Sequence, residues 1–276
     1  MNKESFVIAI VDRIERDKEN IKAEYLKNQK EMGIGFVSVD NLLSEEMAQS
    51  FYPLFSEEND AWREMQSYRE KKLTSKQFNQ FDKTLEDITF AIQDTRVIDK
   101  ITEVTNMKGL SADNTLYAGG LSMMRHGDFL NPHIDNSHDQ DRKVYRRLNL
   151  LYYVTPEWKE EFGGNLELWD KKVKKPVTIE SRFNRLVIME TNPWSWHSVS
   201  QVVPEQVKRC CVSNYYFSKE SPTGGQYYHV TSFMGRPNQT LRRMVCRCDN
   251  LLRMTIRKIK KDGLGRKDQY IKSTEN

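Results

Sequence analysis

Two histidines and one aspartate stand at positions from which their side chains could share a metal ion. His133 and Asp135 are separated by a single residue, and His197 follows further along the chain. Residues two apart on a β-strand point to the same side, so His133 and Asp135 can offer an imidazole and a carboxylate together. A later strand of the same barrel could bring in His197. Two histidines and one carboxylate leave half of an octahedron open, as in non-haem Fe(II) oxygenases.

The spacing of this triad is a weak signal by itself, and other histidines compete for the role. His138 could form an independent metal cluster with His133 and Asp135. His126 and His229 are further candidates, although a hydrogen-bonded or solvated imidazole is the better explanation of each.

An arginine downstream of the triad adds a second chemical feature. Arg209 lies twelve residues after His197, at the start of a strand-like run. A guanidinium in that position can form a bidentate pair with a carboxylate, such as the far end of a dicarboxylate cosubstrate. The neighbouring Lys208 could compete for the role, and a salt bridge at a strand edge is the plainer reading of Arg209.

Six blocks of sequence, in the same order, resemble the prolyl-4-hydroxylase-like branch of the Fe(II)/2-oxoglutarate dioxygenases. The similarity runs over roughly residues 116–217. The blocks are Asn131–Asp135, Arg147–Trp158, Phe162–Trp169, Phe183–Ile188, His197 and Arg209.

The resemblance implies a fold, a set of cofactors and a role for each matching residue. The fold is a double-stranded β-helix, or jelly roll, and the cofactors are Fe(II), 2-oxoglutarate as cosubstrate, and O2. His133, Asp135 and His197 match the iron ligands of the family. The residues that match its cosubstrate-binding positions are Arg209, Tyr153 and Asn149. One departure is Met123, which stands where many members of the family carry a tyrosine.

The reaction implied by the resemblance is hydroxylation of an unactivated C–H bond, with release of succinate and CO2. Related halogenases lack the carboxylate ligand, so Asp135 favours hydroxylation. Desaturation, cyclisation and epimerisation on the same iron remain open, as does a non-catalytic jelly-roll module that only binds a ligand. The substrate is expected to be an amino-acid-like or other small molecule, a natural product, or a peptide.

The surrounding elements divide the chain into three parts. Residues 1–110 are expected to be a mostly helical extension packed on the core, with helices over 1–30 and through most of 60–110. Residues 111–235 contain short strand-like runs separated by turn residues and are expected to form the jelly roll. Residues 236–276 hold 12 lysines and arginines against 4 acidic residues and are expected to add a basic helix over 241–259. The fold class is therefore a mainly β core with flanking helices, α+β overall.

Composition limits the possible functions. The 276 residues carry 43 basic and 39 acidic side chains, and this net charge of +4 argues against a protein built mainly to coat nucleic acid. We see neither a membrane span nor a signal peptide. Four cysteines without a disulfide or zinc pattern indicate free thiols in a reducing compartment. We therefore expect a cytoplasmic enzyme, with a homodimer left open.

Overall fold

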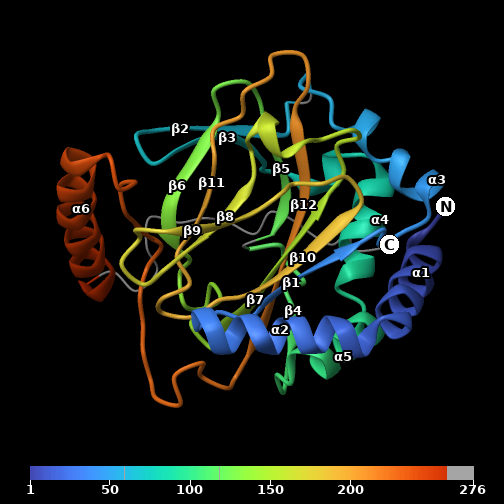
Figure 1. Ribbon diagram of the computed structural model, residues 1–276, viewed down its shortest axis with the longest axis horizontal. Helices are drawn as coiled ribbons and strands as arrows, with labels where there is room; N and C mark the ends of the chain where they lie inside the picture. Colours follow the sequence, from blue (N-terminus) through green and yellow to red (C-terminus); the bar gives the residue numbers. More distant parts are fainter. Residues whose placement is uncertain (59, 118, 260–276) are drawn as a thin grey trace, which may run out of the picture.

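One curled antiparallel sheet forms the centre of the molecule (Figure 1). The computed structural model describes the chain except Asn59, Ala118 and residues 260–276. Neighbouring strands follow the order β1-β10-β7-β12-β5-β3-β6-β11-β8-β9, and β2, β4 and β13 pair with β3, β12 and β6. The strands are β1 Phe36–Asp40, β2 Trp62–Gln66, β3 Glu70–Ser75, β4 Ser111–Ala112, β5 Gly120–Met124, β6 Phe129–Ile134, β7 Tyr145–Tyr153, β8 Leu166–Trp169, β9 Pro176–Ile179, β10 Arg185–Glu190, β11 His197–Val199, β12 Arg209–Ser218 and β13 Ser232–Phe233.

The alternation of side chains along β7 separates the inside of this jelly roll from its outside. Leu148, Leu150 and Tyr152 belong to the large core that the sheet shares with the helices. Leu151 and Tyr153 point to the opposite face and pack within the curl of the sheet. The inward face therefore holds positions 149, 151 and 153, as the sequence predicts for Asn149 and Tyr153.

Helices from the first part of the chain cover the outer face of the sheet (Figure 1). The apolar residues of α1 recur at helical spacing and are fully buried at Phe6, Val7, Ile10 and Ile14. The helices are α1 Lys3–Arg16, α2 Lys18–Met32, α3 Glu45–Gln49, α4 Lys83–Ile92, α5 Thr95–Thr105 and α6 Thr240–Ile259, with short 3₁₀ turns at Tyr52–Leu54, Phe78–Gln80 and Glu160–Phe162. No helix in the described ranges is both long and apolar enough to cross a bilayer.

Several sequence-based expectations are confirmed. Residues 1–30 are helical, with a break at Asp17, and the basic helix expected over 241–259 is α6. The four cysteines are free thiols. The division of the chain into three parts remains a prediction.

The expectation that residues 60–110 are mostly helical is wrong for the first part of that segment. Residues 62–75 form the hairpin β2–β3, and helices begin only with α4. One edge of β3 pairs with β2, while its other edge pairs with both β5 and β6. The N-terminal segment therefore contributes strands to the sheet, β1 included, as well as helices that cover it.

Gly163 sits at a turn where two stretches of backbone approach closely. Its φ of 66° lies in the left-handed region, and a Cβ added there would be 1.9 Å from the backbone oxygen of Gln201. Both conditions require glycine at this position.

We predict that Gly163→Ala lowers the free energy of unfolding by about 2 kcal/mol or more, because alanine is strained at this φ and collides with backbone that cannot rotate away. Urea denaturation measures the effect. Gly225→Ala is the matched control, since a Cβ there would meet no atom within 4 Å. Equal stability of the two variants would contradict the proposed role of the turn.

Candidate active site

Antiparallel pairing of two strands brings the metal-binding candidates together. His133 on β6 lies directly opposite His197, the first residue of β11. Asp135 follows β6 immediately and faces both rings, with 3.7 Å from its carboxylate oxygens to each Nε2 atom. One ligand atom from each residue lies within 4.8 Å of the other two, and all three residues are buried. The structure thus unites the residues that the sequence singled out.

Hydrogen bonds to the backbone fix both imidazoles in the form that a metal requires. Nδ1 of His133 donates to the carbonyl of Asn131, and Nδ1 of His197 donates to the carbonyl of Ser195, each at 3.0 Å. Each Nε2 atom then carries a lone pair instead of a proton. The ring of His133 also stacks on Phe233, with an angle of 20° between the planes.

The electron pairs of the triad converge with no proton between them. Two Nε2 lone pairs face the carboxylate of Asp135, whose Oδ2 atom accepts no hydrogen bond although it is buried. Three acceptors in such proximity repel one another unless a cation lies between them. Two imidazoles and one carboxylate suit a divalent transition metal, so the residues present fit Fe(II).

The surroundings keep His133 neutral and Asp135 ionised. Burial, reinforced by neighbouring His197, lowers the pKa of His133 to about 3. Burial is the largest single influence on Asp135 and by itself would raise its pKa, but the charge of Arg146, together with smaller contributions from His197, His133 and Lys72, outweighs burial and lowers the pKa. Nη1 of Arg146 lies 3.3 Å from Oδ2 of Asp135, and its guanidinium stacks over the ring of Tyr215. Both protonation states are those in which these side chains bind metals.

A cavity of about 750 Å³ contains the triad and extends to Arg209. Arg209 is 3% exposed, and Nε donates to the hydroxyl of Ser181. Its guanidinium lies over the ring of Tyr153 and beside the sulfur of Met124. Within the described part of the chain, this buried cation forms no ion pair with a carboxylate. An anionic ligand in the cavity would therefore supply the counter-charge.

Two further inward-facing groups lack hydrogen-bond partners. The Oδ1 atom of Asn149 lines the cavity and, like the hydroxyl of Tyr153, is buried without a partner. Burial raises the pKa of Tyr153 to about 12, against the opposing charge of Arg209, so its hydroxyl keeps its proton and can donate. Arg209, Tyr153 and Asn149 thus lie where the predicted cosubstrate site needs them, while their role in binding stays a prediction.

The competing candidate Lys208 points away from the cavity. Its ammonium donates to the carbonyl of Phe55 and pairs with Glu57 at 3.3 Å. Consecutive residues of an extended chain face opposite sides, which explains why Arg209 points inward and Lys208 outward.

The remaining histidines have other partners. Nδ1 of His138 lies 2.7 Å from the hydroxyl of Ser137, and its ring packs on Tyr145. His126 is bound to the carbonyl of Val203, and His229 to that of Val230. The metal cluster found among the described residues contains none of these three histidines.

The cavity also contains residues that sequence reasoning missed. Strand β3 turns Glu70, Lys72 and Thr74 toward the cavity, with the carboxylate of Glu70 3.1 Å from the ammonium of Lys72. The inward positions of this strand are polar, so the apolar alternation of a half-buried strand is missing from the sequence. Arg146 directly precedes the block Arg147–Trp158, and nothing in the sequence around it indicated that it contacts Asp135.

Comparison with known proteins shows which family the core resembles. Residues 119–217 match the sequence profile of the 2OG-Fe(II) oxygenase superfamily. Over 87 residues the chain is 32% identical to mouse prolyl 3-hydroxylase OGFOD1, a stretch that covers 29% of this chain and 15% of that protein. The chain thus spans less than a fifth of the length of the curated relatives it matches.

Solved structures share the fold. A prolyl hydroxylase from Trichoplax adhaerens, in complex with a hypoxia inducible factor oxygen degradation domain peptide fragment, superposes with a TM-score of 0.54 and 17% identity, covering 77% of this chain and 96% of that one. A Pseudomonas putida prolyl-4-hydroxylase gives a TM-score of 0.52 with 12% identity, covering 71% and 97%. The jelly-roll core predicted from the sequence is confirmed.

We predict that His133→Ala weakens Mn(II) binding at least about a hundredfold, because one of three ligands is lost and two remain. Titration of the purified protein with Mn(II), with the free ion followed by electron paramagnetic resonance, measures the affinity. His138→Ala is the matched control and should bind Mn(II) like the unmodified protein. Unchanged binding by His133→Ala would rule out the triad as a metal site.

Proposed function

We propose that this chain, whose residues 119–217 match the 2OG-Fe(II) oxygenase superfamily, is an Fe(II)- and 2-oxoglutarate-dependent oxygenase that hydroxylates a C–H bond of a peptidyl substrate. The observation that carries the proposal is the convergence of His133, Asp135 and His197 in a cavity that also holds the buried Arg209. A module that only binds ligands needs no such combination of a metal triad and an anion site.

In this proposal, the three residues of the triad hold the metal. Nε2 of His133, Nε2 of His197 and the carboxylate of Asp135 would hold Fe(II). When bound, iron supplies the oxidative chemistry that couples O2 and 2-oxoglutarate to C–H hydroxylation. Three protein ligands leave coordination positions for cosubstrate and O2.

The protein itself would bind, orient and shield the reactants. Arg209 pairs with the distal carboxylate of 2-oxoglutarate, and the protonated hydroxyl of Tyr153 donates to the same group. Asn149 offers an amide from the same face of β7. Burial of these groups excludes water and strengthens each electrostatic contact.

A prolyl residue in a polypeptide is the substrate class we favour. The curated relatives carry the name prolyl 3-hydroxylase, and the Trichoplax neighbour was solved with a peptide fragment. The cavity is lined by side chains from separate parts of the fold, among them Arg69 near β3, Tyr228 before β13, and Ile256 on α6. A cavity bounded by several elements in this way can take one side chain of an extended peptide.

Anaerobic addition of Fe(II) and 2-oxoglutarate tests the cofactor part of the proposal. A weak visible charge-transfer band is expected on mixing, and succinate release is expected once O2 and a suitable proline-containing peptide are added. A protein that develops no band and releases no succinate would favour the non-catalytic binding module. A band with succinate but a desaturated or cyclised product would instead support one of the other outcomes on the same iron.

We predict that Arg209→Ala raises the Kd for 2-oxoglutarate by about tenfold to a hundredfold, because the carboxylate loses a charged hydrogen-bonding partner in a buried site. Calorimetric titration in the presence of Mn(II) measures this without turnover. Lys208→Ala, the adjacent outward-facing change, should leave the Kd unaltered. If instead Lys208→Ala raised the Kd and Arg209→Ala did not, Lys208 would be the residue that binds the carboxylate of 2-oxoglutarate.

A further inference from the structure

Helix α6 turns a continuous apolar stripe toward solvent. Between 38% and 78% of each side chain in the stripe is exposed: Leu241, Met244, Val245, Leu251, Leu252 and Ile256. At 3.6 residues per turn these positions fall within an arc of about 140°, and neither an acidic nor a basic residue interrupts it. Contiguous apolar surface of this kind on a folded protein marks an interaction site.

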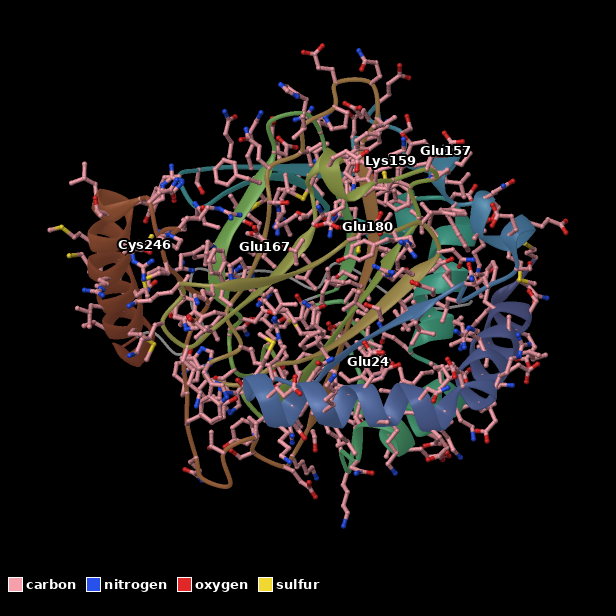
Figure 2. All side chains as sticks on the ribbon, in the orientation of Figure 1. Glu24, Glu157, Lys159, Glu167, Glu180 and Cys246 are labelled. Carbon is pink, nitrogen blue, oxygen red and sulfur yellow. The ribbon has the colours of Figure 1, made fainter. Side chains whose placement is uncertain are left out.

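The opposite face of α6 holds the helix in this orientation. Asn250 exchanges two hydrogen bonds with the backbone of Phe233, and Asp249 pairs with Arg69 at the turn between β2 and β3. Cys246 is buried on this inner face, and Figure 2 labels it on the helix at the outer end of the molecule. The polar face of α6 therefore contacts the rest of the protein, and the apolar stripe on the other side of the helix faces outward.

The surface beside the stripe is positively charged. Arg247 is exposed, and Arg243 donates to the backbone carbonyls of Lys172 and Val173, which holds the loop between β8 and β9 against the helix. The exposed lysines of this loop are Lys171, Lys172, Lys174 and Lys175.

The acidic groups nearby are already engaged. The carboxylate of Asp170 accepts hydrogen bonds from the backbone of Lys172 and Lys174, within the turn of the loop itself. Asp249 pairs with Arg69 and lies 3.9 Å from Arg253. Cations therefore exceed anions around the stripe.

We propose that α6 docks the protein on an anionic lipid surface, with the stripe in the interfacial region and the adjacent lysines and Arg247 against the headgroups. Apolar side chains flanked by basic ones on one helix are the pattern of interfacial membrane helices. A second copy of the chain is the less favourable occupant, because pairing through the stripe brings Arg247 and the lysine loops of both copies together. The inference does not depend on the proposed reaction, although Ile256, at one end of the stripe, also lines the cavity.

Flotation of the full chain with lipid vesicles tests this proposal. Binding is expected to vesicles that contain phosphatidylglycerol, to weaken with added salt, and to be lower for phosphatidylcholine alone. Leu251→Asp combined with Leu252→Asp should reduce binding at least about tenfold, because two apolar side chains no longer enter the interface. Lys174→Gln combined with Lys175→Gln should reduce it about tenfold or more for anionic vesicles.

Ile8→Asp provides the matched control. Ile8 is 51% exposed on α1, which lies at the other side of the molecule from α6 (Figure 1), so this variant should bind vesicles like the unmodified chain. Circular dichroism and thermal unfolding confirm that each variant remains folded. Absence of flotation, or flotation that the leucine changes leave intact, would overturn the proposal. Self-association that the leucine changes abolish, without vesicle binding, would assign the stripe to a contact between copies and equally overturn it.

Discussion

Two imidazole nitrogens and one carboxylate face one another inside this protein, and their mutual repulsion is the constraint on which the site depends. Such an arrangement persists only if the surrounding structure enforces it. The pairing of His133 with His197 across β6 and β11 fixes the distance between the rings. Hydrogen bonds to backbone carbonyls then fix their orientation and protonation. Backbone pairing and backbone carbonyls therefore provide the restraints on both imidazoles.

The two buried arginines of the cavity, Arg146 and Arg209, differ in what surrounds their positive charges. Arg146 is buried beside Asp135 and stacks on Tyr215, which offsets part of the cost of removing a guanidinium from water. Arg209 is also buried, but its surroundings provide an aromatic face, a hydroxyl and a sulfur atom rather than a carboxylate. Arg146 is therefore paired within the protein itself, whereas Arg209 has no carboxylate partner among the described residues.

The sequence was informative where chemistry and periodicity coincide. His133, Asp135, His197 and Arg209 could be selected because their residue types, spacing and neighbouring blocks pointed to one kind of site. The apolar strands of the core and the helix at 240–259 were predictable from alternation and helical periodicity.

The parts that could not be predicted depend on long-range contacts. Strand β3 faces a polar cavity on one side, so its pattern of charges resembled a solvated helix. The contact between Arg146 and Asp135 joins two elements whose approach no local pattern encodes. A basic helix was predicted for this segment, but not that the polar face of α6 is the one that meets the protein, contrary to the usual rule.

The position of β3 in the sheet has a consequence for the order in which the protein assembles. The edge of β3 that does not pair with β2 pairs with both β5 and β6, which are synthesised some fifty residues later (residues 120–124 and 129–134). During translation the hairpin emerges with that edge unpaired, and it must remain so until both partners leave the ribosome. Closure of the jelly roll is then a late, non-local event that slows folding. A nascent chain that stalls before residue 134 would present an open strand edge to its neighbours, which makes this hairpin a natural site for chaperone protection.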